Sequence, residues 1–164
     1  MKNLDDIHHL IQNSTLILVI NASSKTMSKT VFNYIYKKYS DKKRTITSTK
    51  GLLKKISEIK NTLIKIDIDI KKIQFSSSKT SDKLWTDFGT AQVYALDNES
   101  KLLFYAAQYQ KEQFVYRFFD LILIVEKQQI RIKNRYDNDD TYSIEKLVRS
   151  TKLKEIALFS EKES

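Results

Sequence analysis

The sequence contains no cysteine, no proline and only two glycines, Gly51 and Gly89, among its 164 residues. The absence of cysteine excludes disulfide bonds, thiolate zinc sites and cysteine nucleophiles. Two isolated glycines cannot build a glycine-rich phosphate loop or a dinucleotide-binding fingerprint of the usual kind. Composition alone therefore removes several large classes of enzyme, and no motif in the chain implies a cofactor or a bound metal ion.

Long hydrophobic runs are also missing. Apolar runs such as residues 121–125 are far shorter than the ~20 residues that a membrane-spanning helix needs. The first residues lack the basic and apolar segments of a secretory signal. With 41% apolar and 30% charged residues, the chain has the composition of a globular protein. We expect a cytoplasmic protein with no membrane span, folded as a single domain over residues 1–164. If the chain divides into two domains, the boundary between them is expected near residues 76–82.

The charge is strongly positive and unevenly distributed. Lys and Arg number 29 against 20 Asp and Glu, a net charge of +9. Residues 1–80 carry +10 and residues 81–164 carry −1. A lysine-rich genome composition would explain part of the excess, but it would act on both halves alike. The stretch 25–60, with 11 basic and 2 acidic residues, therefore predicts a surface for an anionic partner.

The first half of the chain alternates strand and helix patterns. Residues 15–20 form a continuous apolar run, which is typical of a strand buried on both faces. Apolar residues then recur at helical spacing over 31–39 and again over 49–60. Isoleucines alternate with charged residues over 64–70, which predicts a half-buried strand. The segment 40–49 is predicted to be a polar connection, so this half forms a strand–helix–helix–strand unit.

The second half is rich in aromatic and β-branched residues. Residues 84–96, 101–110, 114–126 and 130–135 favour a meander of antiparallel strands. A loop over 136–141 and a C-terminal helix from Ser143 complete the expectation. The fold class predicted is α/β or α+β with a mixed sheet.

A hydroxyl-rich segment, SSKTMSKT at residues 23–30, follows the first buried strand and opens a helix. It predicts a phosphate-binding helix start made by Ser23, Ser24, Lys25, Lys29 and Thr30. A degenerate phosphate loop is the enzymatic alternative, with Ser23 and Ser28 in the glycine positions and Asp67 or Asp69 as a magnesium ligand. The same residues also suit a plain helix cap with solvated lysines.

The basic stretch leads to the main functional expectation, a non-catalytic protein that binds nucleic acid or another polyanion, alone or within a nucleic-acid-processing complex. Lysines give sequence-independent, salt-sensitive contacts to phosphates. The residues expected to make them are Lys37, Lys38, Lys42, Lys43, Arg44, Lys50, Lys54 and Lys55. Two alternatives stay open: a nucleotide-binding enzyme built on the degenerate phosphate loop, and a protein-interaction subunit that docks through its aromatic C-terminal half.

Overall fold

The computed structural model describes residues 4–39, 42–73, 81–110, 114–127, 129–134 and 140–143. Within them, a seven-stranded sheet has the order β2-β3-β4-β1-β5-β6-β7. The strands are β1 (Leu16–Asn21), β2 (Lys43–Ile46), β3 (Leu63–Asp69), β4 (Lys101–Ala106), β5 (Leu121–Val125), β6 (Gln129–Asn134) and β7 (Asp140–Ser143). Strands β2, β3, β4, β1 and β5 are parallel, whereas β6 and β7 continue the sheet with antiparallel pairing.

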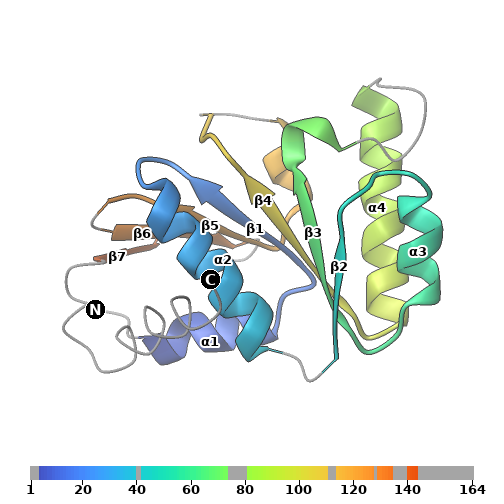
Figure 1. The fold of residues 1–164 in the computed structure, drawn as a ribbon, viewed down its shortest axis with the longest axis horizontal. Helices are drawn as coiled ribbons and strands as arrows, with labels where there is room; N and C mark the ends of the chain where they lie inside the picture. Colours follow the sequence, from blue (N-terminus) through green and yellow to red (C-terminus); the bar gives the residue numbers. More distant parts are fainter. Residues whose placement is uncertain are drawn as a thin grey trace.

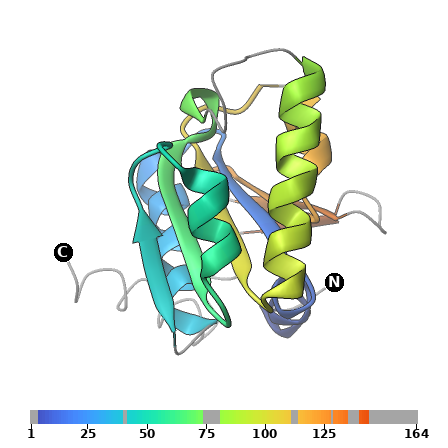
Figure 2. The ribbon, with the colours of Figure 1, turned by 90° about the vertical axis from the view of Figure 1, so that its right-hand side faces the viewer.

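Helices lie on both sides of this sheet (Figure 1). On the side that we call the front, α1 (Leu4–Gln12) and α2 (Lys25–Lys38) pack against the strands. On the back lie α3 (Leu52–Glu58), α4 (Ser81–Asp97) and the short 3-10 helix η2 (Phe114–Phe118). A second 3-10 turn, η1 (Ile70–Lys72), follows β3. Figure 2 shows α3 and α4 side by side, with the sheet between them and α2.

Strand β1 lies at the centre of the sheet and is fully buried. Every residue from Leu16 to Ile20 has 0% of its surface exposed. Ile17 and Val19 belong to the front hydrophobic core, while Leu16, Leu18 and Ile20 belong to the back core. The prediction of a strand buried on both faces is confirmed, and it explains why the sheet needs helices on each side.

The back core is aromatic. Phe88 of α4 stacks on Phe118, with ring centroids 4.6 Å apart and 10° between the planes. Phe119 meets Phe88 and Phe104 edge-on, at 5.8 and 5.2 Å between ring centroids. These aromatic residues of the second half are therefore packed inside and do not form a docking surface.

The mixed α/β class is confirmed. The helices predicted over 31–39 and 49–60 are found as α2 and α3, and the alternating strand is β3. Strands from both halves of the chain interleave, because β4 lies between β3 and β1. Among the described residues, no helix combines the length and the apolar character that crossing a membrane requires.

The predicted antiparallel meander is wrong in two respects. Residues 84–96 lie in helix α4, where Phe88, Ala91 and Ala95 are buried at helical spacing. Their aromatic neighbours suggested a strand, but the small alanines allow the helix to pack closely against the sheet. The second error concerns β4 and β5, which both pair with β1 in parallel. Antiparallel pairing is confined to β5, β6 and β7.

Two short strands were also missed. Residues 43–46 form β2 rather than part of a polar connection, so the N-terminal unit is strand–helix–strand–helix–strand. Only Ile46 of β2 is buried, so backbone pairing with β3, and not the burial of side chains, holds the strand in place. Residues 140–143 form β7, where a loop and a helix start were expected. The predicted C-terminal helix beyond Ser143 lies outside the described residues.

Removing the stacked ring at the centre of the back core tests this packing. We expect Phe88→Ala to lower the free energy of unfolding by about 3–5 kcal/mol, because the cavity is lined by other rings that cannot collapse freely. Urea denaturation measures the change. Lys54→Ala, at an exposed position of α3, serves as the control and should stay within about 0.5 kcal/mol of the parent protein. Equal effects of the two substitutions would contradict the assigned packing.

Candidate functional site

Helix α2 packs on β1 and β4, and among the described residues no helix covers the front of the outer strands β2 and β3. Thr45 pairs with Lys65 in the parallel register, and Lys43 pairs with Leu63. Leu63 belongs to the front core. Since paired residues in a sheet share a face and alternate residues repeat it, Lys43, Thr45 and Lys65 all lie on the front. This part of the sheet is polar because it faces solvent.

Lysine ammonium groups and aromatic rings gather where α2 borders these strands. The Lys65 Nζ lies 5.3 Å from the ring centroid of Phe32 and 5.2 Å from that of Tyr36. It also donates a hydrogen bond to the Asn33 side-chain oxygen, at 3.3 Å. Lys29 from the preceding turn of α2 lies over Tyr105 of β4, with 3.9 Å between Nζ and the ring centroid. These cation–π contacts hold the ammonium groups of Lys29 and Lys65 against neighbouring aromatic rings.

Strand β2 extends the group. Lys43 donates a hydrogen bond from Nζ to the backbone oxygen of Lys37, at 2.6 Å. Its ammonium group also lies 6.0 Å from the Tyr36 ring centroid. The Thr45 hydroxyl donates to the Tyr36 hydroxyl at 3.1 Å. The last turn of α2 is thus joined to the edge strand. We call Lys29, Lys37, Lys43 and Lys65, with the rings of Phe32, Tyr36 and Tyr105, the front basic face.

The charges on this face repel one another. Burial lowers the pKa of Lys65 below its usual value. The Asp67 carboxylate opposes the shift, while the positive charges of Lys29 and Lys37 lower the pKa further. Three ammonium groups are therefore close enough to interact, and Asp67 is the acidic side chain that counters them at Lys65. An anion placed on this face would relieve the repulsion.

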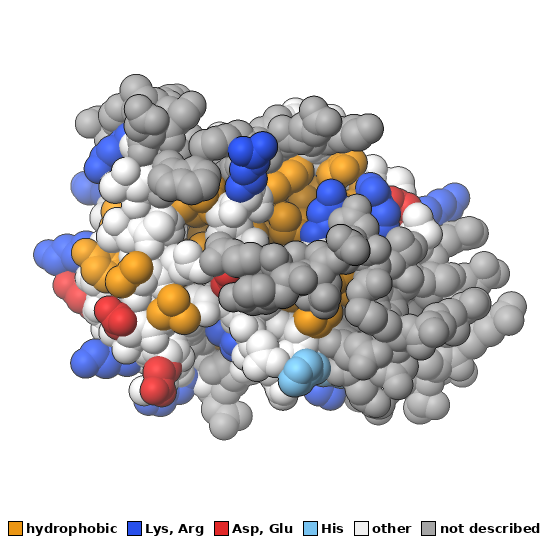
Figure 3. All heavy atoms as spheres, turned by 180° about the vertical axis from the view of Figure 1, so that it is seen from behind, with side chains coloured by type: hydrophobic (Ala, Val, Ile, Leu, Met, Phe, Trp, Pro, Cys, Tyr) orange, Lys and Arg blue, Asp and Glu red, His pale blue; other side chains and the backbone are white. Residues whose placement is uncertain are grey.

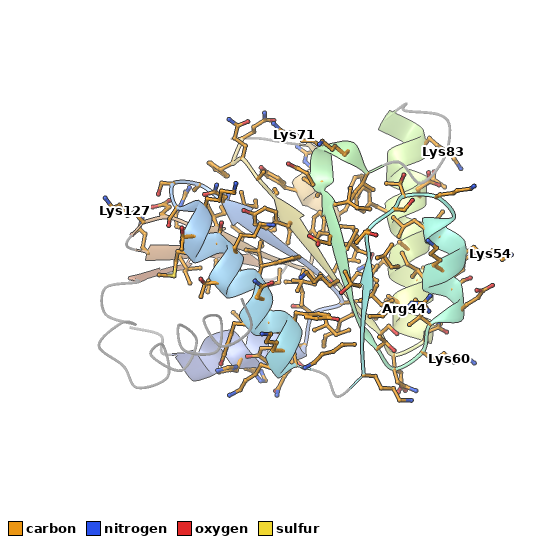
Figure 4. All side chains as sticks on the ribbon, viewed as in Figure 1. Arg44, Lys54, Lys60, Lys71, Lys83 and Lys127 are labelled. Atoms are coloured by element: carbon orange, nitrogen blue, oxygen red, sulfur yellow. The ribbon has the colours of Figure 1, made fainter. Side chains whose placement is uncertain are left out.

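The predicted basic surface is divided by the sheet. Lys37, Lys38 and Lys43 lie at the front, whereas Arg44 points from β2 to the opposite side, in register with back-core Ile64. Lys54 and Lys55 belong to α3, which covers the back. Figure 4 shows Arg44 and Lys54 on the α3 side of the molecule. Lys42 and Lys50 are exposed in the segments flanking β2 and α3, so the positive charge wraps around the β2 edge instead of forming one flat surface.

The expected phosphate-binding segment is mostly helical. Ser24 is the N-cap of α2, and its hydroxyl accepts a hydrogen bond from the Met27 N–H at 3.2 Å. The helix begins at Lys25, so Lys29 and Thr30 lie in its second turn and not in a loop. The Thr30 hydroxyl donates to the Thr26 backbone oxygen at 2.9 Å. The predicted helix cap is therefore present, and phosphate binding at this helix start stays a prediction.

The degenerate phosphate loop does not form in this structure. Ser28, expected in a glycine position, is fully buried, and its hydroxyl donates to the Lys25 backbone oxygen at 2.9 Å. Without glycine, the backbone stays helical instead of wrapping its N–H groups around an anion. The Asp69 side chain accepts a hydrogen bond from the Lys71 N–H and caps the start of η1. Among the described residues, no group of three histidine, aspartate or glutamate side chains gathers to hold a metal ion.

The carboxyl edge of the sheet, where open α/β folds bind ligands, is bridged by the chain itself. The connections after β1 and β4 leave toward opposite faces, which makes their junction the switch point. There Asn21 donates from its side chain to the Ala107 backbone oxygen at 3.1 Å and accepts from the Tyr109 N–H at its own backbone oxygen. Ser23 accepts from the Lys127 N–H at 2.8 Å. These bonds tie the end of β1 to the segments that follow β4 and β5.

Sequence reasoning did not identify Lys65 as part of the site. The alternation over residues 64–70 placed Lys65 and Asp67 on the polar face of their strand. It did not show that α2 and β2 border this face, because that depends on the order of strands in the sheet. Comparisons with protein-family models, with curated proteins and with solved structures found no match. The geometry of the described residues is therefore the basis of the functional argument.

Replacing Lys65 with methionine tests the electrostatics of the face. Since the folded-state pKa of Lys65 lies below its unfolded value of 10.5, the charged side chain opposes folding at neutral pH. This penalty is relieved as the pH rises from the folded-state pKa toward 10.5. We expect Lys65→Met to raise the urea midpoint at pH 7 in low salt, and the difference from the parent to shrink as the pH approaches 10.5.

Lys54→Met on exposed α3 is the control, and its urea midpoint should match that of the parent protein across the same range. A lower midpoint for Lys65→Met at pH 7 would show that the ring contacts of this lysine outweigh the cost of its burial.

Proposed function

We propose that this protein binds the phosphate backbone of nucleic acids, without catalysis and without sequence preference, through the front basic face. The observation that supports the proposal most directly is the gathering of Lys29, Lys43 and Lys65 around one set of aromatic rings. The charge of Lys37 lies close enough to act on Lys65 as well. Clustered lysines that repel one another in the free protein gain most when a polyanion neutralises them.

The geometry of the face suits a phosphate backbone. Lysine offers a point charge on a flexible stem and makes no base-specific bidentate contact, so it serves sequence-independent attachment. Four lysines from α2, β2 and β3 take part in the face. Their positions on three elements spread the charge over the outer sheet, as an extended ligand requires. A nucleic-acid-processing complex is a setting in which such attachment would be useful.

The β2 edge supplies a competing explanation for part of the charge. Lysines on an edge strand discourage pairing with the edges of other sheets, and Lys43 and Arg44 occupy such a strand. This explanation does not apply to Lys29, which lies on α2, or to Lys65, which is half-buried in β3. The proposal therefore depends on these two residues more than on the edge strand.

Salt-dependent binding tests the proposed function. We expect fluorescence anisotropy with short single- and double-stranded DNA and RNA to show binding that weakens by about 100-fold between ~50 and ~200 mM salt, as about four phosphate contacts imply. Lys29→Gln combined with Lys65→Gln should weaken binding to all sequences and lower the salt slope by about 2.

The matched control is Lys54→Gln combined with Lys55→Gln on α3. It removes the same charge from the back of the molecule and should leave the salt slope unchanged. If both double variants lost the same binding affinity, binding would depend on net charge alone and not on the front basic face. Absence of binding at ~50 mM salt would refute the proposed function.

A further inference from the structure

The exposed side of α4 carries apolar side chains that the fold does not use. Val93 is 53% exposed and Leu96 is 56% exposed, and these are the large hydrophobic residues that stand out on the described surface. Figure 3 shows hydrophobic side chains beside acidic ones on the side of the molecule where α4 lies. Isolated exposed hydrophobic residues are common, but this pair shares one face of one helix.

A glycine lies on the same face. Gly89 occupies the interior of the 17-residue helix α4, where glycine costs up to about 1 kcal/mol relative to alanine. A Cβ atom added at Gly89 would meet nothing within 4 Å. The packing of the described residues therefore gives no reason for the missing side chain. Close approach of another backbone to the helix is a physical reason for it.

The spacing of the face is that of a helix-pairing seam. Thr86, Gly89, Val93 and Leu96 follow one another at intervals of three, four and three residues, the pattern of the contact positions in paired helices. All four are exposed. We call these four residues the α4 seam. It runs along the outside of the helix, opposite the buried alanines that face the sheet.

The charges that flank the seam are complementary under one arrangement. Lys83 and Asp97 lie fourteen residues apart, which is two heptads, so they border the same flank near opposite ends of α4. Lys83 also pairs with Asp87 of its own helix at 3.1 Å, and its side chain is 43% exposed. Two antiparallel copies of α4 would place Lys83 of each beside Asp97 of the other. In parallel copies Lys83 and Asp97 would lie at opposite ends of the interface, so the two charges would not meet.

We propose that α4 pairs with α4 of a second copy of this chain, antiparallel and about a two-fold axis. In this arrangement Gly89 of each copy faces Val93 of the other, so a missing side chain meets a large one. Thr86 faces Leu96 in the same way. A two-fold interface requires such self-complementarity, because each contact occurs twice.

A single helix seam is small compared with a stable interface of ~1,600 Å², so the dimer is weak and depends on concentration. The seam lies at the back of the sheet, and the front basic face remains accessible in the dimer. Dimer formation and nucleic-acid binding therefore use different surfaces, and either can fail without the other.

Sedimentation velocity of the full chain without nucleic acid, from ~5 to ~500 µM, tests the dimer. The weight-average sedimentation coefficient should rise with concentration toward that of a dimer. Gly89→Leu and Val93→Lys should each raise the dissociation constant at least ~10-fold, the first by blocking close approach and the second by placing a charge in the seam. Lys54→Leu adds the same leucine to exposed α3 and should leave the dissociation constant unchanged.

A charge exchange tests the antiparallel arrangement. Lys83→Glu and Asp97→Lys should each weaken the dimer, and the double variant should restore it, since the two charges then meet with their signs reversed. Far-ultraviolet circular dichroism confirms that each variant folds. A chain that stays monomeric at ~500 µM, a dimer insensitive to both seam substitutions, or a double variant weaker than either single one would overturn the proposal.

Discussion

The complete burial of β1 is the constraint on which the rest of the structure depends. A strand with no exposed residue from Leu16 to Ile20 needs neighbours on both edges and cover on both faces. Strands β4 and β5 supply the edges. Helices α1 and α2 cover the front, and α3, α4 and η2 cover the back. The parallel pairing follows, because each crossover must carry a helix or 3-10 turn over the sheet before the chain re-enters it.

The helix layers on the two faces of the sheet differ in extent, and this difference creates the candidate site. On the back, α3 and α4 pack side by side over the outer strands. On the front, α2 packs on the central strands, and no other described helix covers β2 and β3. The front of β2 and β3 carries Lys43 and Lys65, where a helix-covered part of the sheet would carry apolar residues such as isoleucine. Positive charge therefore concentrates next to a hydrophobic core, and that position explains both the ring contacts of Lys65 and its lowered pKa.

The same reasoning explains where sequence interpretation failed. An aromatic-rich segment such as 84–96 satisfies both a strand pattern and a helix pattern when its buried apolar residues, among those described, are Phe88 and two alanines. Contact with the rings of Phe118 and Phe119 distinguishes the two, and these residues come thirty positions later in the chain. Strand β2 was missed for a related reason, since its pairing with β3 involves backbone atoms and leaves little hydrophobic signature.

The sequence by itself determined the mixed α/β class, the buried central strand, the helices around 31–39 and 49–60, and the excess of positive charge in the first half. These features depend on local periodicity and on composition, which a linear chain displays directly. Only the tertiary structure decided that α2 and α3 lie on opposite sides of the sheet, which divides the predicted basic surface, and that Lys65 joins Lys29 at the front. Strand order and helix side arise from long-range pairing and packing, and no stretch of sequence contains both partners of such a contact.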